Sequence, residues 1–478
     1  MNAIDKNLHT EAQQTISGRL AEFALGLAYE DIPERVRERA RHLLLDAIGI
    51  AYASRGYQFA RATMDALVSL GAGTSPVIGG GRTLGARDAA IMNGVLAHGL
   101  DYDDTHSRGV IHATVSSFPL ALALADQTKA SGRDFLTAYV AAMETSTRLG
   151  AVAKGGFHQV GFHPTGLIGV FGATLAASRL LGLDREQSVM AQGVALSMAG
   201  GSLEFLEDGA WTKRLHPGWA ASSAITAATL AKYGFIGPRA AYEGRFGLYA
   251  AYLGAQSGAA DLSLATDALG GEWQIEEVAI KPIPACHFTH AAADAAIALS
   301  RASKFDAKAI RSVEVLVPAE VVKTVCEPEA NKRRPANSYD AQFSIPYIVA
   351  TGLLRGRFTL DELEPAAMAD REVLSLAERV HHKIDAASTF PRHYTGEVIV
   401  TLESGEILRH REAINRGSAD RPLSNTEIVG KYLDNACRTL TRDRAERVCT
   451  AVLGLDRAEA ADLANILSQP VRSAGSIS

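Results

Sequence analysis

The sequence GLIGVFGATLAASRLL, at residues 166–181, is apolar on nearly every side when it is arranged as an α-helix. Such a helix is stable in water only if neighbouring elements bury most of its surface. We therefore expect this segment to lie inside a helical domain. Four further segments carry apolar residues at helical spacing, at 16–27, 36–51, 118–129 and 135–149. Because none of them alternates with a period of two residues, residues 1–274 are predicted to form the first part of a large all-helical domain.

The pattern changes after Trp273. Three segments are typical of strands or a hairpin, at 275–281, 313–318 and 397–412, and two are typical of helices, at 289–303 and 341–354. We therefore expect a smaller α+β domain at 275–412. Helical spacing returns after Pro422, so residues 413–478 are predicted to rejoin the first domain. The predicted fold class is mainly α, with the α+β part inserted as a lid before the C-terminal helices.

The composition is typical of a soluble globular protein. Of the 478 residues, 47% are hydrophobic and 21% are charged, and the formal net charge is -5. Nucleic-acid binding requires a dense cationic surface, so no nucleic-acid partner is expected. The apolar runs are too short to span a membrane, the N-terminal residues are polar, and the four cysteines are scattered. We expect a cytoplasmic protein without membrane contact.

Residues 93–112, NGVLAHGLDYDDTHSRGVIH, gather three carboxylates, three imidazoles and a threonine beside an apolar segment. Burying charged groups without partners is costly, so this cluster implies a polar network, a metal or a catalytic site. A calcium loop that starts at Asp101 would need glycine and glutamate where His106 and His112 stand, which excludes calcium. The three histidines and Asp101 could bind a transition metal, although their spacing matches no known signature. A capping network through Asp104 or Thr105 would explain only part of the cluster.

Acid–base chemistry is the remaining interpretation of this cluster. A carboxylate beside a histidine holds the imidazole in one tautomer and moves its pKa toward the working pH. Asp101 paired with His112 would form such a unit if the loop between them folds back. Sequence spacing alone leaves the metal, capping and acid–base interpretations open.

Other segments could complete a site. His163 stands before a proline at the entry to the buried helix, where the helix dipole favours an anion. Lys213 and Arg214 precede Pro217 at another expected helix entry and could clamp a carboxylate. Nearer the C-terminus, the candidates are His287 and His290 before an alanine-rich helix, and Tyr347. No dinucleotide loop, Walker loop or serine-hydrolase elbow occurs, so we expect no cofactor.

Five motifs together resemble the MmgE/PrpD family in order and spacing. They are NGVLAHGLDYDDTH at 93–106, GFHPTG at 161–166, WTKRLHPGWAA at 211–221, PACHFTHAAADAA at 284–296 and DAQFSIPY at 340–347. The family includes 2-methylcitrate dehydratase, cis-aconitate decarboxylase and iminodisuccinate epimerase. The resemblance covers nearly the whole chain. It implies a large helical domain with a smaller α+β lid, usually as a homodimer, and a reaction that needs no metal.

The resemblance also implies site residues in the cleft between the two domains. Position by position, these are Asp101, Thr105, His112, His163, Lys213, His290 and Tyr347. Lys213 and His163 are expected to bind carboxylates and stabilise charge, and Asp101 and His112 are the proton-transfer candidates. Thr105 and Tyr347 would orient the substrate. Further substrate-binding candidates beside His290 are His287, Arg214 and Arg108.

The reactions of this family share one chemical requirement. Each passes through a carbanion or enediolate-like species next to a carboxylate, which needs a base and nearby cations. We therefore expect a metal-independent lyase acting on a small di- or tricarboxylate, 2-methylcitrate dehydratase-like or cis-aconitate decarboxylase-like. An isomerase of the iminodisuccinate epimerase type is the alternative, and a non-catalytic helical scaffold is the second. Because His106 and Arg108 depart from the decarboxylase pattern, dehydration is preferred, and the sequence leaves the substrate open.

Overall fold

The computed structural model describes residues 15–302, 306–390 and 392–471. Contacts divide the chain into two compact units. The first extends to Val278 and resumes at Ser424, and the second extends from Ala279 to Leu423. The fold is mainly α, as predicted, with a small α+β part. No helix in the described ranges is long and apolar enough to cross a membrane.

The first unit consists mainly of helices. They are α2 (Ile16–Gly26), α3 (Glu34–Ser54), α4 (Gln58–Leu70), α5 (Ala86–Ala97), α6 (Thr114–Thr128), α7 (Gly132–Val152), α8 (Gly156–Gln159), α9 (Pro164–Leu180), α10 (Arg185–Leu196), α11 (Phe205–Asp208), α12 (Thr212–Lys232), α13 (Leu248–Leu253), α21 (Asn425–Ala436), α22 (Arg442–Leu453) and α23 (Ala460–Ser468). Its strands are two residues long, at β1 (Ser75–Pro76), β2 (Thr83–Leu84) and β3 (Thr105–His106). The helices expected from apolar spacing are therefore present.

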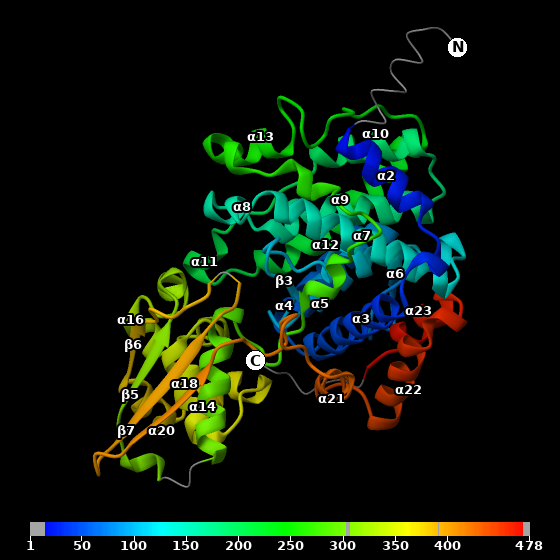
Figure 1. Cartoon of the computed structure of the whole chain (residues 1–478). Helices are drawn as coiled ribbons and strands as arrows, with labels where there is room; N and C mark the ends of the chain where they lie inside the picture. Colours follow the sequence, from blue (N-terminus) through cyan, green and yellow to red (C-terminus); the bar gives the residue numbers. More distant parts are fainter. Residues whose placement is uncertain (1–14, 303–305, 391, 472–478) are drawn as a thin grey trace. The chain divides into compact units, whose positions relative to one another are not determined.

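Helix α9 lies inside the first unit, as its composition predicts. All of its residues from Pro164 to Ser178 are buried. Helices α6, α7, α10 and α12 pack around it (Figure 1). Because its neighbours cover every side, α9 fixes the places where their ends, and the loops between them, come together.

Two glycines allow α5 and α12 to cross with their backbones in contact. A Cβ added to Gly94 would lie 2.4 Å from the Cα of Gly218. A Cβ added to Gly218 would lie 2.4 Å from the carbonyl oxygen of Ile91. Only glycine permits so close a backbone approach at these two positions. This crossing brings the first turns of α12 to the end of α5.

The start of α12 differs from the sequence prediction. The sequence places the helix entry near Pro217, whereas the helix begins at Thr212 and contains the proline. Proline lacks a backbone N–H and so leaves the carbonyl of Lys213 without its helical bond. Lys213 and Arg214 thus belong to the first turn of the helix.

A buried ion pair attaches the C-terminal helices to the rest of the first unit. Helix α21 packs against α3, and the Nζ atom of Lys431 lies 2.7 Å from Oδ1 of Asp46. The same ammonium group donates a hydrogen bond of 2.8 Å to the carbonyl oxygen of Tyr102. Lys431 therefore joins α21 both to α3 and to the loop that follows α5.

The second unit contains a four-stranded sheet in the order β6–β5–β7–β8. Its elements are α14 (His290–Ala302), β5 (Ile310–Val317), α15 (Val322–Val325), α16 (Glu329–Arg333), α17 (Ser338–Gln342), α18 (Ile345–Arg355), α19 (Pro365–Met368), α20 (Arg371–Ala377), β6 (Val380–Ile384), β7 (Gly396–Leu402) and β8 (Ile407–Glu412). Strand β5 pairs in parallel with β6 and antiparallel with β7, and β7 and β8 form the predicted hairpin. Helix α14 packs against β7 and β8, and α18 packs against α14 (Figure 1).

Two predicted elements are shorter in the structure than the sequence suggests. The strand expected at 275–281 is reduced to β4 (Val278–Ala279), because a 3-10 turn at Gln274–Glu277 precedes it. The helix expected at 341–354 is divided, because Ser344 caps the start of α18 by accepting a hydrogen bond of 3.0 Å from the backbone N–H of Tyr347. Local hydrogen bonds thus override helical and strand patterns at these points.

We expect Gly94→Ala to destabilise the protein, because the added methyl group would meet the backbone of α12. Overpacking of this kind costs about 1–3 kcal/mol. The matched control is Gly430→Ala in α21, where an added Cβ meets nothing within 4 Å. That change should instead stabilise the helix by about 0.5–1 kcal/mol. Denaturant unfolding measures both, and equal stabilities for the two variants would contradict the close crossing.

Candidate active site

The loop between α5 and α6 carries most of the polar cluster. His98 ends α5 as its C-cap, and His112 stands two residues before the start of α6. Between them, Asp101 and Val110 have φ angles of 49° and 52°, in the left-handed region that L side chains rarely adopt. Strained backbone of this kind is concentrated at functional sites, where the surrounding structure holds it in place.

One carboxylate oxygen holds two histidines. The Oδ2 atom of Asp103 lies 2.8 Å from Nδ1 of His98 and 3.0 Å from Nδ1 of His112. Burial alone would raise the pKa of Asp103, but the two imidazoles hold it well below its usual value. An ionised carboxylate only accepts hydrogen bonds, so Nδ1 of His98, which is hydrogen-bonded to Asp103, carries a proton. When the ring of His98 is neutral, its lone pair is then on Nε2.

His112 pairs with Asp103 in the structure, whereas the sequence spacing suggests a pairing with Asp101. Asp101 is engaged differently, because its Oδ1 atom lies 2.9 Å from Nζ of Lys213 in a largely buried ion pair. The two aspartates still lie close together, since Asp101, Asp103 and His112 each place one ligand-type atom within 4.8 Å of the others. Sequence spacing could not distinguish two carboxylates that are two residues apart.

Two further histidines meet at the entries of α9 and α12. His163 is the N-cap of α9, as the following proline predicts, and its Nδ1 atom lies 2.9 Å from Nδ1 of His216. Burial, followed by Lys213 and the neighbouring imidazoles, lowers the pKa of His163 well below its usual value. Burial also lowers the pKa of His216, to about 4. Both rings are therefore neutral near pH 7, and one donates its Nδ1 proton to the other.

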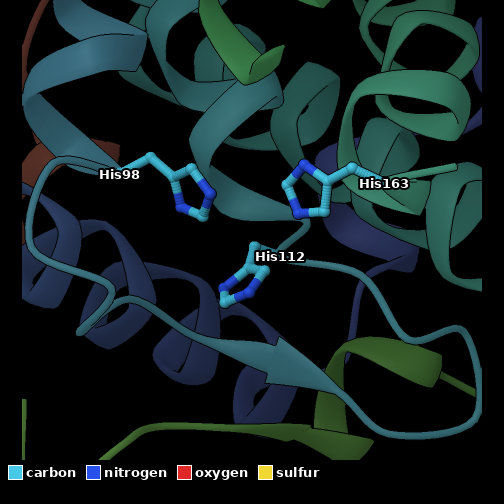
Figure 2. A group of neighbouring side chains, drawn as sticks. All are labelled: His98, His112 and His163. Carbon is cyan, nitrogen blue, oxygen red and sulfur yellow. The ribbon is translucent and has the colours of Figure 1, made fainter. Parts of the chain in front are cut away.

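Three imidazoles from distant parts of the sequence surround one space. Figure 2 shows the rings of His98 and His163 side by side, with the ring of His112 below them. One ligand nitrogen of each lies within 4.8 Å of those of the other two. The ring centroids of His98 are 4.7 Å from His112 and 5.7 Å from His163. Asp103 thus joins the residues expected from the sequence, together with His98 and His216, which the sequence offers as a possible metal ligand and as a neighbour of Lys213 before Pro217. In the sequence, these residues can be recognised because they lie inside the same motifs.

The predicted arginines contact groups of the first unit. The Nε atom of Arg214 donates to the carbonyl oxygen of Gly99 at 2.7 Å, and its guanidinium group lies 4.7 Å from the ring centre of Phe59. Arg108 donates to the side-chain oxygen of Gln274. Their contribution to substrate binding stays a prediction.

Thr105 and His106 form strand β3. Thr105 is half-buried, and His106 is buried and accepts a hydrogen bond of 3.1 Å from the backbone N–H of Gly109. Burial lowers the pKa of His106 to about 3, so this ring is neutral. Within the described residues, His106 belongs to neither group of side chains that could hold a metal. The histidine that joins His98 and His112 there is His163.

The second unit contains His287, His290 and Tyr347. The ring centroids of His287 and His290 are 4.8 Å apart, and Nε2 of His287 accepts a hydrogen bond of 2.9 Å from the Asn415 amide. Nε2 of His290 donates to a backbone carbonyl at 3.1 Å. The hydroxyl of Tyr347, buried in α18, donates to the carbonyl oxygen of Glu362 at 2.6 Å. The functional roles of these three residues stay predictions.

Comparison with known families agrees with the motifs. The MmgE/PrpD N-terminal domain matches residues 18–260, and the MmgE/PrpD C-terminal domain matches residues 283–457. The chain therefore belongs to the MmgE/PrpD family, as the sequence motifs predict.

Several named relatives align with nearly the whole chain. The cis-aconitate decarboxylase-like protein oryM of Aspergillus oryzae is 27% identical over 474 residues, which cover 95% of this chain and 96% of the relative. Cis-aconitate decarboxylase of Mus musculus is 27% identical over 463 residues, covering 93% and 92%. The 2-methylcitrate dehydratase of Escherichia coli (strain K12) is 25% identical over 468 residues, covering 90% and 92%.

A carboxyl group next to the site titrates near neutral pH. Asp104 is buried, and its Oδ1 atom accepts a hydrogen bond of 3.4 Å from the backbone N–H of Thr114. Burial raises the pKa of Asp104 from 3.8 to about 7. The folded state therefore binds a proton at pH values where the unfolded chain has lost it. The resulting stability is complete below about pH 4 and is lost as the pH rises through about 7.

We expect Asp104→Asn, which imitates the neutral carboxyl group, to gain stability relative to the unaltered protein when the pH rises. Urea unfolding at about pH 5 and about pH 8 measures this difference. The control is Asp65→Asn on α4, where the side chain is exposed. If the free energy of unfolding changes by the same amount between the two pH values in both variants, Asp104 is not the source of the pH dependence.

Proposed function

We propose that this protein is a metal-independent lyase that acts on a small di- or tricarboxylate by proton transfer next to a carboxylate group. The observation that carries the proposal is the pairing of His112 with a buried, ionised Asp103, beside the Lys213–Asp101 ion pair. The family and the relatives named cis-aconitate decarboxylase and 2-methylcitrate dehydratase support the same reaction class.

His112 is the proposed proton-transfer residue. Asp103 lies 3.0 Å from its Nδ1, so that a proton at Nδ1 makes Nε2 the basic nitrogen, and the carboxylate stabilises the imidazolium that forms when Nε2 takes a proton. The backbone N–H of His112 also donates to the hydroxyl oxygen of Thr165 at 3.1 Å. Side chain and main chain of this residue are therefore both held in place, as a general base requires.

Lys213 and His163 are the proposed groups for carboxylate binding. The Lys213 ammonium group is the cation of the cluster, and a substrate carboxylate can share it with Asp101. The neutral ring of His163 donates through Nε2 when its Nδ1 accepts the proton of His216. Both contacts stabilise negative charge that develops next to the bound carboxylate during the reaction.

The two candidate lyase reactions use these groups in different orders. In dehydration, His112 takes a proton from the carbon beside a carboxylate, and the imidazolium so formed gives a proton to the hydroxyl on the neighbouring carbon, which leaves as water. In decarboxylation, a C–C bond breaks first, CO2 leaves with its carboxylate oxygens, and the remaining carbanion takes a proton from the imidazolium. Both orders require charge stabilisation at the same place.

The other assignments are part of the same proposal. Thr105 and Tyr347 orient the substrate, Asp101 assists proton transfer, and further contacts to the substrate come from His287, His290, Arg214 and Arg108. We also propose that the protein acts as a cytoplasmic homodimer, without a nucleic-acid or membrane partner.

Alanine substitution of Lys213 or of His112 should each lower kcat/KM by about a hundredfold or more. Lys213→Ala also leaves the buried Asp101 without its cation, which destabilises the fold. The double variant Asp101→Asn/Lys213→Ala removes that charge, so it should recover stability without recovering turnover. The control is Lys323→Ala, at an exposed position on α15. Near-normal turnover in either single variant would remove that residue from the mechanism.

The substrate class is tested by incubating the purified protein, with EDTA present, with 2-methylcitrate, cis-aconitate and iminodisuccinate in deuterated water. NMR should show net loss of water from the first compound or of CO2 from the second, and the EDTA should not reduce turnover. Deuterium exchange without net product from iminodisuccinate would favour the epimerase alternative. Lack of reaction and exchange with all three compounds would contradict the proposed substrate set, and dependence on a metal would contradict the proposed mechanism.

A further inference from the structure

The imidazole cluster of His98, His112 and His163 has the geometry of an incomplete metal site. Its ligand nitrogens lie within 4.8 Å of one another (Figure 2). Bonds of 2.0–2.1 Å from zinc to nitrogen in a tetrahedral site place neighbouring nitrogens about 3.4 Å apart. The rings therefore need to approach one another by no more than about 1.4 Å, which side-chain rotation can supply.

One nitrogen of each ring already has a close polar neighbour. Asp103 holds Nδ1 of both His98 and His112, and His216 lies at Nδ1 of His163. Metal-binding histidines almost always use their second nitrogen in this way, most often toward a carboxylate. We therefore place a ligand on the Nε2 side of the rings.

One of these Nε2 atoms lacks a partner in the fold. His98 is 1% exposed, and its Nε2 has no hydrogen-bond partner among the described residues. A buried polar atom without a partner costs about 1–3 kcal/mol. The pairing of His112 with Asp103 accounts for the proposed catalysis and assigns no role to this nitrogen. A bound cation would satisfy it.

The ligand atoms of the cluster and the charge beside them both indicate which kind of ion would bind. Three imidazole nitrogens suit Zn²⁺ and similar transition-metal ions, whereas Ca²⁺ and Mg²⁺ prefer oxygen ligands. Asp101 and Lys213 offset each other, and the Asp103 carboxylate places a further negative charge beside the imidazoles. A divalent cation is attracted to such a site.

We propose that His98, His112 and His163 bind one divalent transition-metal ion of the Zn²⁺ type, and that this ion competes with catalysis. The competition rests on the proposed function, because the ion would occupy Nε2 of His112, the basic nitrogen, and Nε2 of His163. The fourth position of the ion is open to water or a carboxylate. The metal is in this way an inhibitor of the reaction and has no part in it.

Calorimetric titration of the EDTA-treated protein with Zn²⁺ tests the site directly. One ion should bind per chain, and His98→Gln should weaken binding at least about tenfold. The matched control is His381→Gln, at an exposed position on β6, which should leave the affinity unchanged. Co²⁺ should give the intense visible absorption of a four-coordinate site in the unaltered protein and lose it in the His98 variant. Because a variant can misfold, His163→Gln is measured in parallel and circular dichroism is recorded for each.

Two results would overturn the metal site: no binding to the unaltered protein, or equal binding to it and to both histidine variants of the cluster. The competition is measured as loss of turnover at fixed free Zn²⁺, with each protein compared to its own metal-free rate. Loss should be smaller in His98→Gln, and full turnover of the zinc-loaded protein would refute the competition. If no substrate turns over at all, the proposed function and the competition fail together, and the titration alone decides the site.

Discussion

A buried carboxylate must be paired, and the ionised side chain of Asp103 is paired with two imidazoles through a single oxygen atom. This constraint fixes the ring of His98 at the end of α5 and the ring of His112 at the start of α6. The loop between them has to close far enough for both rings to reach the same oxygen. The left-handed conformations at Asp101 and Val110 are the local cost of that closure.

Helix packing supplies the other half of the cluster. The glycine contact between α5 and α12 brings the first turns of α12 against the end of α5. There, Lys213 meets Asp101, and His216 meets the histidine that caps α9. In this region, the close approach of the two backbones therefore also positions the side chains of the site. A larger residue at the crossing would disturb both.

The sequence predicts the parts of this structure that depend on local pattern. The apolar composition of α9, the β7–β8 hairpin and the place of His163 before a proline all follow from neighbouring residues. The side-chain pairings of the site do not follow from local pattern. Asp101 and Asp103 have the same chemistry and stand two residues apart, so the sequence does not show which of them pairs with His112 and which with Lys213. His216 lies inside a recognised motif, yet its partner His163 caps another helix. The early start of α12 depends on packing that tolerates an internal proline.

The ion pair of Lys431 has a consequence for the order in which the protein is made. Its ammonium group donates a hydrogen bond to the carbonyl oxygen of Tyr102, which stands between Asp101 and Asp103. Lys431 and Tyr102 are 329 residues apart in the sequence. During synthesis the loop after α5 therefore emerges long before the side chain that secures it. Until α21 has left the ribosome and docked on α3, the buried Asp46 lacks its cation as well. A nascent chain can thus lack an ordered cluster until α21 has been synthesised and has docked on α3.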